Sequence, residues 1–262
     1  KNWENVTPKD CPKWMMWNCV EVDPFKKGAA YFVGTRYKLD DYTPYIYKTE
    51  DYGKTWTLIT NGIDKMHFAR CIRADHNRPG LLYAGTEYGM YISFDDGANW
   101  KKFQLHLPIV PVTDMTIKDN DLVVATQGRA FYVLDDLSVL QQMNPDFLNE
   151  NLHVFNVNPA WRIGGGGRFR GNFGTPRNAG ANPPNGPVIN YYVKDITDST
   201  KASIMIMDKD KKMIKTFSTN SKENRFDIGK GMNQFVWDML YPEAERVEGM
   251  ILRTVVPGSS LA

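Results

Sequence analysis

Short segments that alternate apolar and polar residues follow one another through the first 140 residues of the chain. Between residues 18 and 60 they read NCVEVD, AAYFVGT, YIYKTED and TWTLIT, and turns rich in Gly, Pro or Asp separate them. A period of two residues, carried by β-branched and aromatic side chains, predicts β-strands. We therefore expect four short strands in this stretch.

The same order of segments returns further along the chain. The stretch CVEVDPFKKGAAYFVGT at 19–35 aligns with CIRADHNRPGLLYAGT at 71–86, and a worn third copy at 121–137 matches 81–97 at a constant offset of 40. Upstream, WENVTPKD at 3–10 has the pattern of the last strand of one more copy. Four strands that recur every 40–45 residues, roughly, are typical of the blades of a β-propeller.

An eight-residue box lies between the third and fourth strands of two copies, TEDYGKTW at 49–56 and SFDDGANW at 93–100. Its Asp accepts hydrogen bonds from backbone N–H groups across a turn, its Gly tolerates a positive φ, and its Trp packs on the neighbouring strand. Each of these properties builds a turn, so we predict a structural role for the box and not a catalytic one. The structural box residues are Asp51, Gly53, Trp56, Asp95, Gly97 and Trp100.

The two boxes resemble the Asp box, or bacterial neuraminidase (BNR) repeat, of sialidases, xyloglucan-cleaving double propellers and the sortilin propeller. Residues 1–140 as a whole look like the last blades of large secreted sortilin-like proteins labelled glycosyl hydrolase, which are frequent in Bacteroidetes. The resemblance implies an incomplete ring of Asp-box β-propeller blades. It also implies a secreted, periplasmic or outer cell-surface location in a Gram-negative bacterium. One departure is Gln127, which stands where we expect His in relatives.

The second half of the chain differs in amino-acid composition from the first. Residues 141–186 read as a Gly/Pro/Asn-rich connector; the glycines lack the Lys-Ser/Thr of a phosphate-binding loop, and the arginines are too sparse for a nucleic-acid clamp. From 187 to 262 strands resume, in a stretch similar to the immunoglobulin-like domain of the flagellar hook-capping protein. The resemblance implies a small immunoglobulin-like β-sandwich that is truncated, because its last strands are missing.

Composition and charge exclude several classes of function. A net charge of +2 predicts no nucleic-acid partner, and no apolar run is long enough to span a membrane. The cysteines, Cys11, Cys19 and Cys71, form no CxxC pair, and the four histidines lack a ligand spacing. We therefore predict no metal and no cofactor, and no catalytic residue is identified.

Propeller geometry narrows the search for a ligand site. Ligands of propellers meet the face made by the loops between second and third strands and by the connections between blades, whereas the boxes lie at the opposite end. In such a site tyrosine rings stack on sugars or on peptide side chains, and charged residues orient the ligand. The alternative is that this face, which we call the rim, is only a solvent-exposed surface without a ligand. The ligand-face candidates are Arg36, Tyr37, Asp40, Asp41, Tyr42, Arg70, Glu87, Tyr88, Asp114, Gln127 and Arg129.

Three functions stay open from the sequence. The first is a secreted or cell-surface binding protein that engages a glycan or a polypeptide through the propeller face. The second is a glycoside hydrolase of the double-propeller type, with part of its active site outside this chain, and the third is a structural subunit of an envelope assembly. Because an open ring exposes blade faces, we expect the chain to be a fragment whose propeller is completed by the remainder of the same polypeptide or by another chain.

Overall fold

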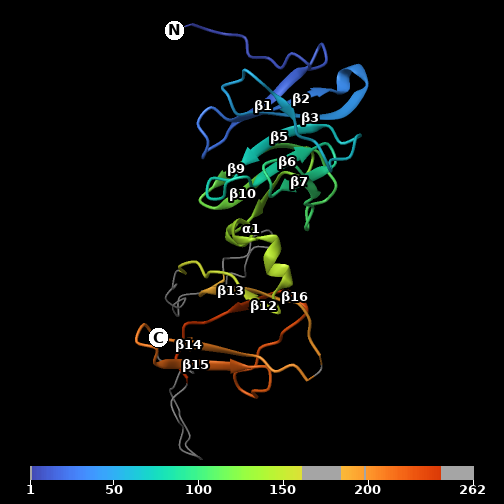
Figure 1. The fold of residues 1–262 in the computed structure, drawn as a ribbon. Coiled ribbons are helices and arrows are strands. Elements are labelled where there is room, and N and C mark those ends of the chain that lie inside the picture. The colour runs from blue at the N-terminus through green and yellow to red at the C-terminus, as the bar shows by residue number, and fades with distance from the viewer. Residues whose placement is uncertain (1, 161–183, 198, 243–262) are drawn as a thin grey trace, which may run out of the picture. The chain divides into compact units, whose positions relative to one another are not determined.

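The computed structural model describes residues 2–160, 184–197 and 199–242, and the chain divides into two compact units, Lys1–Gln141 and Gln142–Ala262 (Figure 1). Nearly all regular structure in the described residues is antiparallel β-sheet, which confirms the all-β class that the alternating pattern predicts. No helix in this part of the chain is long and apolar enough to cross a membrane.

Unit 1 begins with two sheets of four strands each, in which every strand pairs with the next one along the chain. We call the first sheet blade 1 and the second blade 2. Blade 1 consists of β1 (Met16–Val22), β2 (Ala30–Arg36), β3 (Asp41–Thr49) and β4 (Thr57–Leu58), with the 3-10 turn η1 (Tyr37–Leu39) between β2 and β3. Blade 2 consists of β5 (Ala69–Ala74), β6 (Leu82–Thr86), β7 (Gly89–Ser93) and β8 (Lys101–Lys102). Both sheets therefore have the four-strand order of propeller blades.

The third sheet, blade 3, has three strands among the described residues: β9 (Val112–Lys118), β10 (Asp121–Thr126) and β11 (Phe131–Leu134), followed by α1 (Ser138–Gln142). Leu122 lies opposite Leu134, whereas the matching Leu82 of blade 2 lies opposite Ser93. The β10–β11 hairpin is thus one residue longer than its counterpart. The constant offset of 40 is wrong beyond this hairpin, where it becomes 41, so Tyr132 corresponds to Tyr91.

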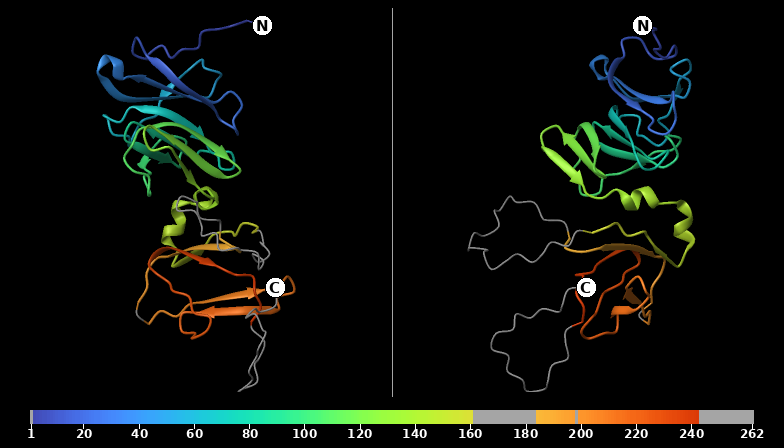
Figure 2. Two further views of the ribbon diagram at one scale, coloured as in Figure 1. Left: turned by 180° about the vertical axis from the view of Figure 1, so that it is seen from behind. Right: turned by 90° about the vertical axis from the view of Figure 1, so that its left-hand side faces the viewer.

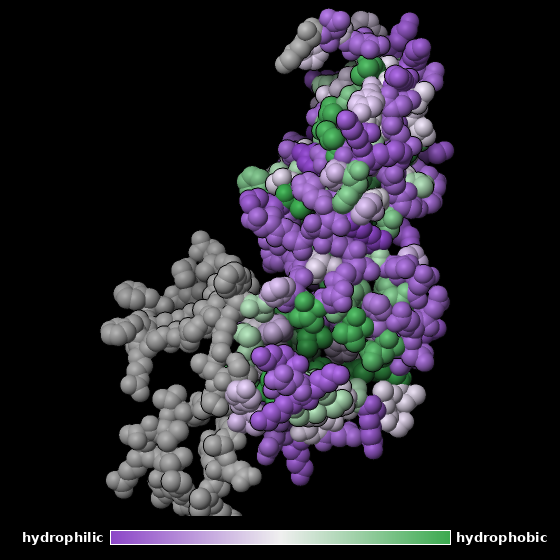
Figure 3. Space-filling view, turned by 60° about the vertical axis from the view of Figure 1, so that its left-hand side comes forward, coloured by the Kyte–Doolittle hydropathy of each residue, from purple (hydrophilic) through white to green (hydrophobic). Residues whose placement is uncertain are grey.

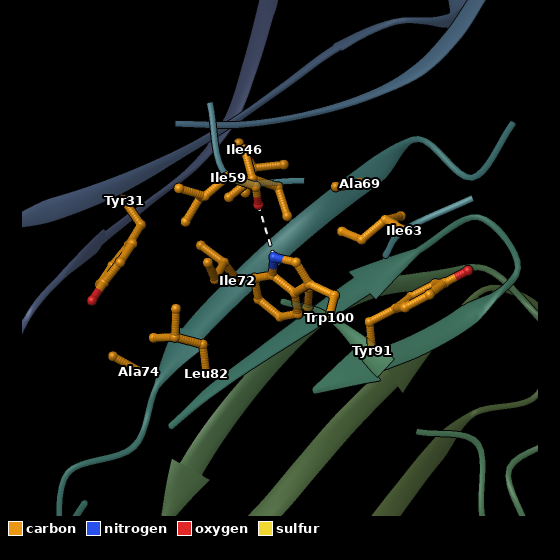
Figure 4. Close-up of a cluster of buried hydrophobic side chains, with 12 residues drawn as sticks. Tyr31, Ile46, Ile59, Ile63, Ala69, Ile72, Ala74, Leu82, Tyr91 and Trp100 are labelled. Atoms are coloured by element: carbon orange, nitrogen blue, oxygen red, sulfur yellow. Dashed lines mark hydrogen bonds between the residues drawn. The ribbon is translucent and has the colours of Figure 1, made fainter. Parts of the chain in front are cut away.

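The first strands of the three sheets, β1, β5 and β9, are neighbours, and both views of Figure 2 show the three sheets of unit 1 following one another. An apolar layer joins blade 1 to blade 2, with Trp100 at its centre (Figure 4). Trp100 is only 3% exposed, and its indole Nε1 donates to the Ile59 carbonyl at 2.7 Å. A second layer joins blade 2 to blade 3 around Leu81, Tyr83 and Leu122. Burial of these large side chains, about 1.5–3 kcal/mol each, stabilises the stack.

Unit 2 contains two smaller sheets. One has the order β12-β13-β16, and β14 and β15 form a hairpin. The strands are β12 (Leu152–Val154), β13 (Val188–Val193), β14 (Ser203–Met207), β15 (Met213–Ser218) and β16 (Gly231–Val236). Tyr191, Val193 and Phe226 are the buried centre of this unit. Figure 3 shows hydrophobic residues gathered on one face of it.

The predicted connector is more regular at its start than the sequence indicates. Within 141–186 the structure contains η2 (Pro145–Asn149) and β12, which pairs with β13 because Phe147, Phe155 and Tyr192 pack together. The remainder of the Gly-rich segment, 161–183, and the end of the predicted sandwich, 243–262, lie outside the described residues. The connector and the truncated immunoglobulin-like sandwich therefore stay predictions.

Candidate functional site

The enlarged loop of blade 1 is closed by an ion pair at its base. Arg36 at the end of β2 lies opposite Asp41 at the start of β3, and its Nη1 is 2.7 Å from Asp41 Oδ2. The Tyr45 hydroxyl also donates to that oxygen at 2.9 Å. Burial raises the pKa of Asp41, but hydrogen bonds from Thr43 and Tyr45 and the Arg36 charge outweigh it, so the net pKa is lowered. Asp41 is therefore an ionised anchor of the loop.

Above this base, side chains from three separate segments meet in what we call the Arg70 cluster: Tyr37, Tyr42, Phe68, Arg70 and Glu87. The Tyr37 and Phe68 rings stack with centroids 5.1 Å apart, and Tyr42 lies 6.1 Å from Phe68 at a tilt. The Arg70 guanidinium lies 5.7 Å from the Tyr37 centroid and 5.1 Å from that of Phe68. It also pairs with Glu87 at 2.6 Å. One guanidinium thus holds two aromatic rings and a carboxylate together.

Tyr88, next to the cluster in the chain, is positioned by a histidine. The rings of His67 and Tyr88 stack at 4.7 Å, and His67 Nδ1 lies 2.8 Å from the Tyr91 hydroxyl. Burial lowers the pKa of His67, with a smaller opposing effect of Asp64, so the ring is neutral at pH 7. Tyr88 remains 48% exposed, so a large part of the residue is accessible to solvent.

Asp114 belongs to a different group, on the first strands of the three sheets. Arg73 of β5 lies 2.6 Å from Asp114 of β9, 2.9 Å from the Cys19 sulfur and 3.7 Å from Glu21 of β1. Burial raises the pKa of Glu21 despite hydrogen bonding from Ala74 and the Arg73 charge. Arg73 is absent from the sequence-based candidates. The aligned stretches CVEVD and CIRAD carry a signal for it, because Glu21 and Arg73 occupy the same position with opposite charge.

Three candidates stay apart from these groups. Asp40 is exposed and has a left-handed φ of 60° at the end of η1. Gln127 and Arg129 lie exposed in the β10–β11 loop, where the Gln127 N–H donates to the Pro111 carbonyl at 2.9 Å. Among the described residues the structure does not join these three to the Arg70 cluster. The candidate residues therefore fall into the Arg70 cluster with the pair of Arg36 and Asp41 near it, the group of Arg73 and Asp114, and these three separate residues.

The two eight-residue boxes have matching turn geometry. Asp51 accepts from Thr55 N at 2.9 Å, and Asp95 accepts from Asn99 N at 2.8 Å. Each Gly N–H donates to the first hydroxyl of its box at 2.9 Å. Hydrogen bonds from the Thr55 side chain and backbone lower the pKa of Asp51 to about 2. These carboxylates are fully engaged by their own turns.

Beside the second box lies a groove of about 470 Å³ between blades 1 and 2. Lys48 reaches both Asp96 and Glu50 there, and the Tyr31 hydroxyl also donates to Asp96. Pairing with Lys26 and Lys48 lowers the pKa of Glu50 to about 2. The groove therefore stays net negative, because among the described residues Lys48 is its one lining cation beside the carboxylates of Glu50, Asp95 and Asp96. In the described part of the chain no group of three or more His, Cys, Asp or Glu residues is arranged to hold a metal ion.

The order and pairing of the strands show an all-β protein whose first two sheets have the strand order of propeller blades. No protein-family model matches the chain, and no curated protein matches it. Solved structures that resemble it include YCF48 bound to D1 peptide (22% identity, TM-score 0.34, covering 46% of this chain and 37% of that one). Others are the GH74 enzyme of Niastella koreensis (14%, TM-score 0.37, 68% and 28%) and an ancestral GH74 enzyme (12%, TM-score 0.37, 78% and 27%). The chain matches less than half the length of each of these structures.

Proposed function

We propose that the protein is a binding protein that takes a glycan or a polypeptide on the Arg70 cluster and the adjoining ring of Tyr88. The observation that carries the proposal is the assembly of the cluster from three chain segments around one guanidinium. A surface ordered in this way loses little conformational entropy when a ligand binds. Tyr42 and Tyr88 remain 36% and 48% exposed, which leaves ring surface for stacking.

The pairing of the rim carboxylates supports binding over hydrolysis. A glycoside hydrolase needs one carboxyl group with a raised pKa as acid and a second as base or nucleophile. Asp41 and Glu87 instead pair with Arg36 and Arg70 at 2.7 and 2.6 Å, and the pKa of Asp41 is lowered. The lowered pKa of Asp41 makes this carboxylate a poor general acid at neutral pH. A hydrolase of the double-propeller type would use other carboxylates, such as Glu21, whose pKa burial raises, and Asp114, both of which pair with Arg73.

We also propose a specific propeller type for unit 1, a fold for unit 2 and a cellular location for the protein. We assign 49–56 and 93–100 as Asp boxes of a sortilin-like propeller, which is supported by the shared Asp turn and by the buried indole N–H bonds. For unit 2 we propose an immunoglobulin-like sandwich, supported by its two antiparallel sheets. From the resemblance to secreted sortilin-like proteins we propose a secreted, periplasmic or outer-surface location in a Gram-negative bacterium.

The test is a binding screen with matched tyrosine variants. The labelled 262-residue chain is applied to a glycan array and a peptide array, and any ligand found is titrated by calorimetry. Tyr42→Ala and Arg70→Lys should each weaken binding about tenfold or more, because stacking and the flat guanidinium contacts are lost. Tyr52→Ala is the control, since Tyr52 is 64% exposed within the first box. Equal loss in the control, or unchanged binding in both rim variants, would contradict the proposal.

A further inference from the structure

β11 forms an open sheet edge in the described part of the chain. Blades 1 and 2 each cover the third strand with a fourth, whereas blade 3 ends its sheet at β11. Phe131 and Val133 on this strand are 73% and 54% exposed. An exposed edge with apolar side chains is a template for pairing with another strand.

The fourth strands of blades 1 and 2 show what such an edge accepts. They read Trp-Thr-Leu-Ile at 56–59 and Trp-Lys-Lys-Phe at 100–103. The two middle residues pair with the third strand, and the last N–H donates to it at 2.9 Å, from Ile59 to the Ile46 carbonyl and from Phe103 to that of Met90. Both indole N–H groups donate at 2.7 Å to a carbonyl of an earlier segment, that of Val6 for Trp56 and that of Ile59 in blade 1 for Trp100.

In blade 2 the indole of Trp100 fills an apolar slot (Figure 4). The slot includes Ile59, Ile63, Leu82, Ala84 and Tyr91. The corresponding residues one blade further on are Phe103, Leu107, Leu122, Val124 and Tyr132, and they line a hollow of about 150 Å³ next to β11. The local turns match as well, since Ile63 N donates to the Thr60 carbonyl and Leu107 N to that of Gln104. An apolar hollow of this size accepts a benzene-sized ring.

A third segment of this chain has the same form. Residues 3–6 read Trp-Glu-Asn-Val, and the Val6 carbonyl accepts the Trp56 indole as the Ile59 carbonyl accepts that of Trp100. Val6 also packs at Gly53 where Ile59 packs at Gly97. The apolar residue that ends each segment thus contacts the next blade in the same way, whereas Trp3 is 97% exposed and has no blade before it in the described residues.

We infer that the open edge of β11 and its hollow bind a partner β-strand of the form Trp-x-x-apolar. The strand pairs antiparallel with Tyr132 and Val133, and its Trp ring enters the hollow between Phe103 and Tyr132. The Phe131 carbonyl accepts the last N–H of the strand, as the Met90 carbonyl does in blade 2. This interface is separate from the Arg70 cluster and holds whether or not that cluster binds a ligand.

The test uses a peptide copied from the chain itself, NWENVTP (residues 2–8), with 5-fluorotryptophan in place of Trp3. Its fluorine resonance is recorded while the 262-residue chain is added. We expect a saturable shift to the position of a buried indole. The unlabelled peptide should displace the probe, whereas the peptide with the substitution Trp3→Ala should compete at least about tenfold more weakly.

Two variants at one position separate strand pairing from a general apolar contact. The N–H of Val133 faces the same edge as the Phe131 carbonyl, because residues two apart on a strand point the same way. Val133→Pro removes this donor and is tolerated at a sheet edge, so we expect folded protein with at least about tenfold weaker binding. Val133→Ala keeps the donor and should bind within about threefold of wild type.

Three results would overturn the inference. One is an unchanged fluorine resonance up to about 1 mM peptide. Another is equal affinity of the Val133→Pro and wild-type chains. The third is a dimer in sedimentation velocity that persists in Val133→Pro, because a second copy would then cover the hollow through a different surface.

Discussion

Removal of the Trp100 side chain should destabilise unit 1 far more than removal of Trp56. Trp100 is 3% exposed and lies in the layer between blades 1 and 2, whereas Trp56 is half-buried and stacks on Phe32 at 4.5 Å. Deletion of a fully buried Trp costs about 3–5 kcal/mol. Trp56→Ala removes less buried area, and we expect a loss of about 1–2 kcal/mol.

The expected loss at Trp100 is a large part of a domain's total stability of about 5–15 kcal/mol. It has two origins, the cavity among Ile59, Ile72 and Leu82, and the buried Ile59 carbonyl that loses its indole donor. A cavity lined by apolar side chains stays dry, so no water replaces the indole donor and the two contributions add.

Hydrogen exchange measured by mass spectrometry is the suitable assay, since the two units need not unfold together. Trp100→Ala should lower the protection of β5 and β6 by about 3–5 kcal/mol and leave β13 and β16 of unit 2 unchanged. A loss below about 1 kcal/mol at β6, or equal losses in Trp100→Ala and Trp56→Ala, would refute the packing argument.

Further predictions concern the boxes and the loop of blade 1. Asp95→Ala should lower the free energy of unfolding of unit 1 by about 1–3 kcal/mol and leave the affinity of any rim ligand unchanged; a large affinity loss with normal stability would contradict the structural role. The Thr55 contacts lower the pKa of Asp51 from 3.8 to about 2, so its stabilising effect is complete above its ordinary pKa and is lost as the pH falls through about 2. Acid unfolding of Asp51→Asn should therefore show a flatter pH dependence between those values than wild type, and identical curves would refute it. Asp40→Ala should leave the melting temperature unchanged because Asp40 is exposed, whereas Asp41→Ala should lower it because the half-buried Arg36 loses its partner. Differential scanning calorimetry of both variants decides, and equal melting temperatures would contradict the anchor role of Asp41.

The hydrophobic pattern by itself determines the strands and the turns of unit 1. Alternation over residues 18–60 and 71–102 predicts both four-stranded sheets, because a period of two is a local property of extended backbone. The boxes are readable for the same reason, since Asp51 bonds to Thr55 only four residues away. In the second half the pattern misses β12, a three-residue strand whose place depends on packing against β13.

Only the tertiary structure decides which side chains meet. Of the rim candidates, Tyr37, Tyr42, Arg70 and Glu87 come together, but they do so around Phe68, which no sequence signal marks. The stacking of blades brings these residues into contact, and contacts between distant segments leave no periodic trace in the chain. The same holds for the slot of Trp100, whose indole bonds to Ile59 across 41 positions, and for the hollow beside β11, which joins Phe103 to Tyr132 of the next sheet. Turns and strands are determined by residues close together in the sequence, whereas the candidate sites are formed by packing between repeats.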